Sequence, residues 1–310
     1  MTIANISSRF GVQIDVADPS VPVNIGGITR QNIETGSDVR EEMTSGDVYP
    51  RHQAMYAQKP VAQFTSYALA DLLAACGLTG LLMANGGVNY YAQHWLDGST
   101  PKGTLSHRKY NILSGVLIPR RISVQHQGDA TIEYEHLITY DGTNEPIVIT
   151  DSITLPTGVD DDQRFTLYDC KLGNVTLSQV QSFDVEFGVD GRTEGGDSDI
   201  WDTFSRLRGF KPRLTVVGTD VEWWKSSNIP LVGKLATHAN TLVRLRKRSG
   251  TGFVADATGQ HISFTGDGLA YIQTGMSDQG DDAATITVEM PLRYDGTNSP
   301  LAISTTAVLT

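Results

Sequence analysis

Alternation of apolar and polar residues is the main pattern along this chain, and it predicts short β-strands. Within residues 131–140, one face carries Ile132, Tyr134, His136 and Ile138, and the other carries Glu133, Glu135 and Leu137. Residues 180–187 and 285–292 alternate in the same manner. Because successive side chains of a strand point to opposite faces, each segment is expected to cover a core with one face.

Further strands are expected at residues 61–65, 115–119, 213–217 and 242–248. Asp-Gly at positions 141–142 and 295–296 is a turn signal, and residues 147–149 offer a returning strand. Residues 36–58 and 85–106 read as long polar loops, which in compact domains are usually functional or disordered.

Helical spacing is found at only two places. In residues 67–76 the apolar positions recur at helical intervals, and Thr65 or Ser66 can cap the segment. In residues 220–225 Thr219 can act as the cap, with Val221 and Trp224 buried. The pattern as a whole predicts a mainly β fold with minor α.

A long internal repeat divides the chain. The pentapeptide Tyr-Asp-Gly-Thr-Asn occurs at residues 140–144 and again at 294–298. An ordered series of other matches, 152 or 154 positions apart, includes Tyr49 with Trp201 and Lys59-Pro60 with Lys211-Pro212. Each copy has the commonest size of a domain, about 150 residues. We therefore predict two tandem β-sandwich or open-barrel domains, each with one flanking helix, at residues 1–155 and 165–310, joined by a linker at 156–164.

Composition is that of a globular protein, with 39% hydrophobic and 19% charged residues. The net charge of −11 argues against a protein that grips nucleic acid, since such binding needs basic surface. No apolar stretch approaches the ~20 residues that span a bilayer, so membrane insertion is not expected. Cys76 and Cys170 fall at unrelated places in the two copies, which makes a structural disulfide improbable and favours a reducing compartment.

Motifs for catalysis, cofactors and metals are missing from the sequence. It has no Gly-x-Ser-x-Gly, phosphate-binding loop or His-Glu-x-x-His. Its seven histidines are scattered, and only His107 and His261 match between the copies. Asp160, Asp161 and Asp162 read as a solvated linker more readily than as a calcium site. We predict no enzyme activity, catalytic residue, cofactor or metal.

Two groups of charged residues are candidate contacts between subunits or rings. The motif Glu-x-Gly-x-Asp-x-Arg occurs twice, and a repeated contact is commoner than a repeated active site. Its charged members are Glu34, Asp38 and Arg40, and Glu186, Asp190 and Arg192. The second group is a basic cluster on one strand that comprises Arg244, Arg246, Lys247 and Arg248. We expect carboxylates to pair with this cluster.

The order of these elements resembles that of the tail tube (major tail) proteins of long-tailed bacteriophages. A strand at 34–40 leads into the polar segment 45–50, and Lys59-Pro60 precedes strand 61–65 and helix 67–76. The Gly-led apolar strand 115–119 then precedes 130–140. Tube proteins usually have one such domain and form six-membered rings. The resemblance therefore implies a homotrimer with pseudo-sixfold symmetry that stacks into a tube.

The resemblance also implies a role in genome ejection. If each domain gives four strands to an inner barrel, a ring of roughly 24 strands would leave a lumen about 40 Å wide, enough for duplex DNA. We expect a negative lumen through which DNA passes without specific binding. The implied partners are the chain itself and the tail terminator, distal tail and tape measure proteins. The implied location is the virion tail, assembled in the host bacterial cytoplasm.

Residues 41–58 and 85–106 are expected to contact stacked rings. Two other functions fit a β-rich chain. One is a tandem β-sandwich module for receptor binding or capsid decoration, and the other is a carbohydrate-active enzyme on a β scaffold.

Overall fold

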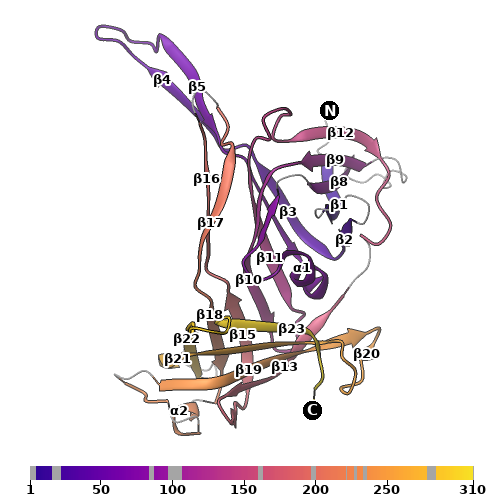
Figure 1. The fold of residues 1–310 in the computed structure, drawn as a ribbon, viewed down its shortest axis with the longest axis vertical. Helices are drawn as coiled ribbons and strands as arrows, with labels where there is room; N and C mark the ends of the chain where they lie inside the picture. Colours follow the sequence, from indigo (N-terminus) through magenta and orange to yellow (C-terminus); the bar gives the residue numbers. More distant parts are fainter. Residues whose placement is uncertain are drawn as a thin grey trace.

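The computed structural model describes residues 5–15, 22–83, 87–96, 107–159, 163–196, 200–220, 222–226, 229–232, 236–277 and 284–309. Strands dominate this part of the chain, together with the helices α1 (Leu69–Cys76) and α2 (Trp223–Ser226) (Figure 1). The predicted class, mainly β with minor α, is confirmed.

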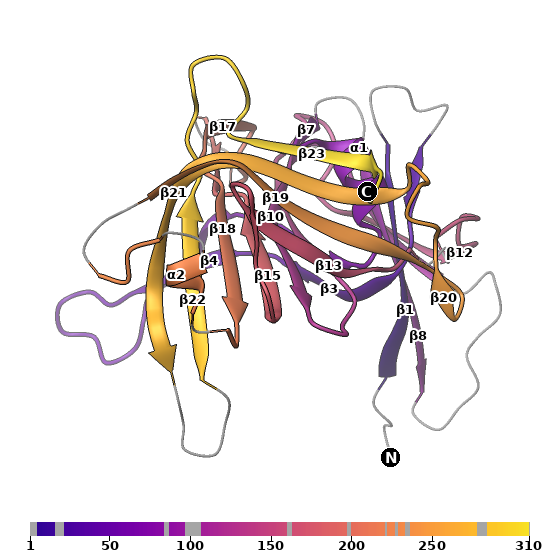
Figure 2. The ribbon, with the colours of Figure 1, turned by 90° about the horizontal axis from the view of Figure 1, so that it is seen from below.

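A run of eight antiparallel neighbours, which we call the central sheet, passes through both halves of the chain. In spatial order its strands are β21 (His261–Ser277), β22 (Thr285–Pro291), β18 (Arg213–Gly218), β15 (Val180–Glu186), β10 (Gly115–Gln125), β11 (Thr131–Ile138), β6 (Val61–Ser66) and β3 (Ile28–Glu34). The first four belong to the second half and the last four to the first half. The halves are therefore joined edge to edge through β10 and β15 (Figure 2).

An outer sheet packs over each half. The first contains β12 (Val148–Ile153), β9 (His107–Ile112), β8 (Val88–Leu96), β1 (Asn5–Ile14) and β2 (Val23–Ile25). The second contains β23 (Leu301–Ala307), the N-terminal part of β21, β19 (Ala236–Ser249), β13 (Phe165–Leu172) and β14 (Val175–Thr176). Two short strands, β7 (Leu81–Met83) and β20 (Gly252–Phe253), pair with β10 and β19. In Figure 1 the second outer sheet crosses the central strands.

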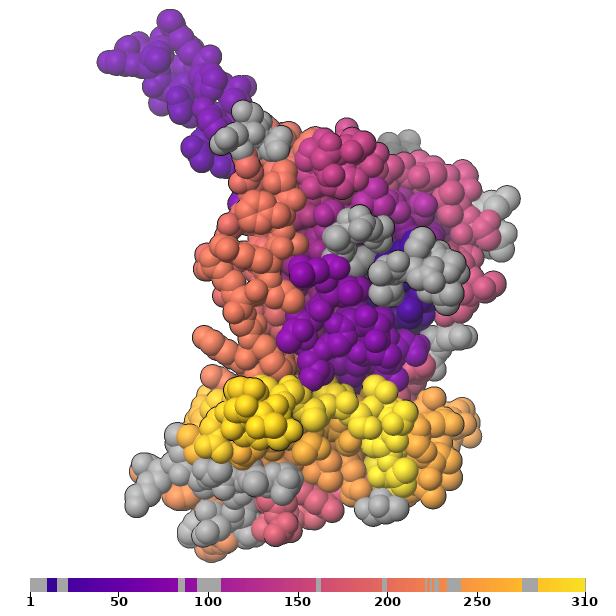
Figure 3. All heavy atoms as spheres, viewed as in Figure 1, coloured from indigo at the N-terminus to yellow at the C-terminus, as the bar shows by residue number. Residues whose placement is uncertain are grey.

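Each half also has a hairpin. The first hairpin, β4 (Ser37–Glu42) and β5 (His52–Gln58), projects away from the body of the molecule (Figures 1 and 3). The second hairpin, β16 (Val189–Glu194) and β17 (Phe204–Phe210), lies against β10 and β11 of the first half. The two hairpins have the same strand pairing but different surroundings.

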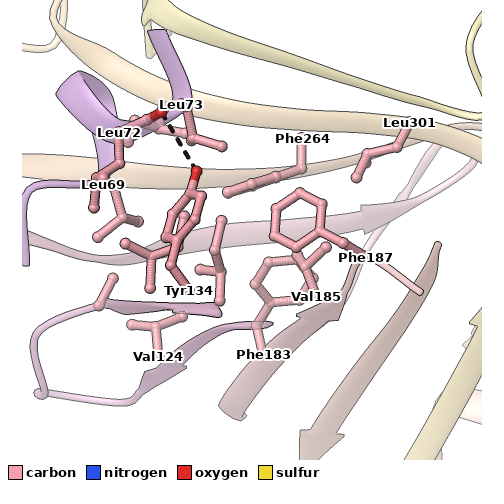
Figure 4. Packing of buried hydrophobic residues seen from close by; sticks show 14 of the residues in the cluster. Leu69, Leu72, Leu73, Val124, Tyr134, Phe183, Val185, Phe187, Phe264 and Leu301 are labelled. Carbon is pink, nitrogen blue, oxygen red and sulfur yellow. Dashed lines mark hydrogen bonds between the residues drawn. The ribbon is translucent and has the colours of Figure 1, made fainter. Parts of the chain in front are cut away.

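The core is one continuous cluster. Alternating residues of the central strands are buried, as the apolar periodicity predicts. Tyr134 of β11 donates a hydrogen bond to the carbonyl oxygen of Leu72 in α1 (3.3 Å). Figure 4 shows this contact beside Phe183 of β15 and Phe264 of β21. Apolar burial therefore links the first half to the second.

Strand pairing follows the same scheme in both halves, irregularities included. In the first hairpin the register shifts between Asp38 and Val39, and in the second it shifts between Asp190 and Gly191, 152 positions later. The pairs β3–β6 and β15–β18, β6–β11 and β18–β22, and β9–β12 and β21–β23 also keep register at offsets of 152 to 154. We call residues that occupy the same place in the two schemes corresponding residues.

Two segments expected to be loops contain strands. The segment 36–58 is mostly the first hairpin, because residues 37–42 pair with residues 52–58. Within 85–106, residues 88–96 form β8, which pairs with β1 and β9. Tyr90 and Ala92 are buried there, so the tertiary partner outweighs the polar composition. Residues 85, 86 and 97–106 lie outside the described residues.

Other boundaries also differ from expectation. The strand expected at 34–40 is two strands, since β3 ends at Glu34 and β4 begins at Ser37. The strand returning after Asp141-Gly142 is β12, and it pairs with β9 of the outer sheet, not with β11. The turn thus passes the chain from one sheet to the other.

The helices are shorter than expected. Helix α1 begins at Leu69, and the hydroxyl of Ser66 accepts the N–H of Ala68 (2.9 Å) instead of capping a helix from residue 67. Helix α2 covers four residues and buries Trp223. Val221 and the side chain of Trp224 lie outside the described residues, as do Asp160, Asp161 and Asp162 of the expected linker.

Candidate assembly interface

The repeated pentapeptide forms the same turn twice. A carboxylate oxygen of Asp141 accepts the N–H groups of Thr143 and Asn144 at 2.8 and 2.7 Å. Asp295 accepts those of Thr297 and Asn298 at 2.7 Å each. Hydrogen bonds from the side chain and then the N–H of Asn144 lower the pKa of Asp141, and those from the N–H and side chain of Asn298 lower the pKa of Asp295 to about 2. The pentapeptide is therefore a local turn motif.

The glycine of each Glu-x-Gly-x-Asp-x-Arg motif starts a hairpin. Gly36 has φ of 58°, and a Cβ built there would lie 2.1 Å from the carbonyl oxygen of Lys59. Gly188 has φ of 60°, and its Cβ would lie 2.2 Å from the carbonyl oxygen of Lys211. Only glycine fits this close approach. The recurrence of the glycine thus has a steric cause.

The charged members of these motifs are all exposed: Glu34, Asp38 and Arg40, and Glu186, Asp190 and Arg192. They do not converge, because Glu34 and Glu186 end central strands whereas the others lie on the hairpins. Arg40 and Asp38 form an exposed ion pair at 3.2 Å. Their role as subunit contacts stays a prediction.

The loop of the second hairpin docks on the first half through Trp201. The indole N–H donates to Oε1 of Gln58 (2.8 Å), and the ring lies 5.1 Å from that of Tyr140. The N–H of Gln58 donates to the carbonyl oxygen of Ile200 (2.6 Å). The backbone carbonyl oxygen of Asp202 accepts the N–H of Tyr140 (2.8 Å). Direct backbone and aromatic contacts therefore fix how the halves meet.

An ion pair and close packing extend this contact. Lys59 Nζ lies 3.2 Å from a carboxylate oxygen of Asp202, whose side chain is largely buried. Farther along the hairpin, a Cβ at Gly191 would lie 2.3 Å from Cδ1 of Ile118. The guanidinium of Arg120 donates to the carbonyl oxygen of Val189 (2.7 Å). The second hairpin thus contacts the first half both at its base and at its loop.

The second part of the junction is the pairing of β10 with β15. Residues 121–125 face residues 186–182 in antiparallel register. Arg121 also forms an ion pair with Asp184 across the two strands (2.8 Å). The hydrogen bonds of this pairing come from the backbone, so another free strand edge of matching register offers the same donors and acceptors.

The face of the central sheet turned away from the core is strongly charged. Its carboxylates are Glu34, Glu133, Glu135, Asp184, Glu186 and Glu289, and its guanidinium groups are Arg30, Arg120, Arg121 and Arg213. Several are paired: Arg120 with Glu135, Arg121 with Asp184, and Arg213 with Glu289. Among the described residues of the central strands, six acidic and four basic groups give this face a net negative charge.

The basic cluster of β19 lies in the second outer sheet and is paired with carboxylates of the same chain. Arg244, which is 9% exposed, contacts Asp169 at 2.6 Å. Arg246 contacts Asp256 at 2.8 Å, and Arg248 contacts Asp129 at 2.9 Å. Lys247 Nζ donates to the side chain of Gln260 (3.3 Å). Pairing with carboxylates was expected, but here these partners come from the chain itself.

The corresponding histidines His107 and His261 are both buried, in β9 and β21. Among the described residues, no group of three or more His, Cys, Asp or Glu side chains is placed to hold a metal ion. Both cysteines are buried free thiols, and burial raises the pKa of Cys76 to about 12. No helix in the described ranges is long and apolar enough to cross a membrane.

A cavity of about 460 Å³ lies beside the junction. Its described lining includes Phe10, Tyr110, Ile149 and Trp201, with Glu145 as the carboxylate. Glycoside hydrolysis commonly uses a pair of carboxylates, and the residues described around this cavity supply one. The cavity therefore adds nothing specific to the enzyme alternative.

Sequence reasoning missed the contact between Trp201 and Tyr140, although it matched Trp201 to Tyr49 and Tyr140 to Tyr294. The signal available was the aromatic character of all four positions. No protein-family model matches the chain, and no curated protein matches it.

Proposed function

We propose that this chain is a tail tube protein of long-tailed bacteriophages, built from two tandem copies of one tube domain. Three chains would close into a ring with pseudo-sixfold symmetry, and stacked rings would form the conduit for genome ejection in the virion tail. The tail terminator, distal tail and tape measure proteins would be its partners.

The observation that carries this proposal is the central sheet. Each half contributes four strands, and β10 and β15 join the halves edge to edge. One edge of this sheet is β3, and the C-terminal part of β21 forms the other. Repeating the β10–β15 junction between β21 of one chain and β3 of the next would extend the sheet, and a closed ring would remove both exposed edges.

The charge of the sheet supports a conduit for DNA. The part of the face turned away from the core that the second hairpin leaves uncovered would line the lumen, and the carboxylates of this face outnumber its guanidinium groups. Screening at physiological salt acts over ~8 Å, so a negative wall repels DNA only when the duplex comes close. Such a wall allows passage without retention.

Electron microscopy of the purified protein, combined with light scattering, tests the proposal. The expected result is rings of three chains and stacked tubes, on its own or after addition of a tail-initiation complex. A receptor-binding module or an enzyme would give discrete particles without stacking. A monomer at every concentration, with and without the initiation complex, would contradict the proposal.

A further inference from the structure

The first hairpin exposes large apolar side chains on a segment that projects from the body (Figure 3). Val48 and Tyr49 near its tip are 81% and 80% exposed. Val39 and Met55 along its strands are 56% and 43% exposed. A soluble chain that leaves such a segment uncovered usually buries it against a partner.

Three of the four corresponding residues of the second hairpin are covered, whereas Ile200, which corresponds to Val48, is 37% exposed. Trp201, which corresponds to Tyr49, packs on Tyr140 and bonds to Gln58. Gly191, which corresponds to Val39, lies against Ile118. Leu207, which corresponds to Met55, packs against the core. The second hairpin therefore shows what kind of surface can cover such a hairpin.

The surface that corresponds to this docking site is present on the second half. Tyr294 corresponds to Tyr140, and Phe210 corresponds to Gln58. Tyr271 of β21 corresponds to Ile118, since each faces the corresponding glutamate of the adjacent strand. Tyr294 is 61% exposed. Within one chain, the first hairpin is directed away from this surface (Figure 1).

We propose that the first hairpin of one chain docks on the second half of a second copy, with Tyr49 on Tyr294 as Trp201 sits on Tyr140. This inference rests on the proposed function and names its lateral contact. It places residues 41–58 between neighbours within a ring, whereas the sequence assigned them to contacts between stacked rings.

The same operation joins the sheet edges. Glu186 faces Arg121 at the junction within the chain. Glu34 corresponds to Glu186, and Thr274 corresponds to Arg121 because both follow a register shift in the same place. Glu34 of one copy therefore lies opposite Thr274 of the next. The hairpin contact and the strand-edge contact are two separate patches, and together they fix the position and the direction of the second chain.

Disulfide trapping tests the edge. The variant Glu34→Cys/Thr274→Cys should give chains linked into dimers and trimers under oxidising conditions, seen on a non-reducing gel. Each single variant should stay unlinked. Arg121→Cys/Glu186→Cys is the matched control, because its disulfide forms within one chain and leaves the mass unchanged.

Substitution at the hairpin tests the aromatic contact. Tyr49→Ala and Tyr294→Ala should each weaken association at least tenfold in analytical ultracentrifugation, with melting temperatures of the single chain unchanged. Tyr49→Trp should associate as well as the parent, and exposed Ile149→Ala should have no effect. Tubes that form normally in both alanine variants, without the Glu34–Thr274 link, would overturn this inference and leave the proposed function standing. A parent protein that never assembles would overturn both.

Discussion

Trp201 and Tyr140 lie 61 residues apart in sequence, in different halves of the chain, yet their rings are 5.1 Å apart at an angle of 40°. This contact holds the second hairpin on the first half. It also defines the geometry that the exposed pair Tyr49 and Tyr294 would reproduce between chains.

Truncation of Trp201 should loosen the second hairpin. We expect Trp201→Ala to lower the free energy of unfolding by about 2 kcal/mol, because the indole is only partly buried and loses one hydrogen bond. Trp201→Tyr, which introduces the residue of the corresponding position, should cost less than about 1 kcal/mol. Urea denaturation measures both, and equal stability of the alanine variant and the parent would contradict the role given to this ring.

The glycine at the base of the second hairpin should not tolerate a side chain. Gly188→Ala puts a Cβ against the carbonyl oxygen of Lys211, and Gly142→Ala meets open space at a similarly positive φ. We expect a cost of about 1 kcal/mol at Gly142, from backbone conformation alone, and of more than about 3 kcal/mol at Gly188. Thermal denaturation compares the two variants, and similar losses would show that the close approach is relieved by a small shift.

The innermost ion pair of the basic cluster should stabilise the fold. Asp169→Ala leaves Arg244 buried without this carboxylate, and we expect a loss of about 3 kcal/mol. Asp38→Ala removes an exposed partner of Arg40, which should cost about 0–1 kcal/mol. Chemical denaturation of both variants at low and high salt measures these two losses of stability. A loss at Asp169 no larger than that at Asp38 would argue that the second outer sheet rearranges around Arg244.

Buried His136 should make stability depend on pH. Burial lowers its pKa from 6.5 to about 3, so the unfolded chain binds a proton between these values and the folded chain does not. Stability is therefore full above pH 6.5 and falls towards pH 3, by up to about 1.4 kcal/mol per pH unit. His136→Met, which introduces the residue of the corresponding position, should flatten this slope, whereas exposed His126→Met should not. Unfolding at pH 7 and pH 4.5 tests the difference.

The charged face of the central sheet should control whether assembled tubes retain DNA. We expect the parent to bind duplex DNA weakly even at low salt. Glu133→Lys/Glu186→Lys adds positive charge to the face proposed to line the lumen and should produce salt-sensitive retention. Arg246→Glu in the outer sheet is the control and should leave DNA binding unchanged. Tight binding by the parent that disappears in Arg246→Glu would place DNA on the basic cluster instead.

Local features were determined by the sequence itself. The turn at Asp141 forms from hydrogen bonds that span at most three residues, so its recurrence at Asp295 could be predicted without knowing the fold. Alternation likewise predicted the buried faces of β11, β15 and β22, because the period of two depends only on strand geometry.

Tertiary structure alone decided which strands meet. The sequence could not show that β12 leaves its hairpin neighbour for β9, or that β10 joins β15, since backbone pairing is nearly independent of side-chain identity. The sequence also could not show which of the two hairpins is covered and which is exposed, because their motifs match. The second hairpin makes a buried contact because Tyr140 and Ile118 of the first half lie beneath it. The first hairpin is exposed because no described residue of this chain takes their place beneath it.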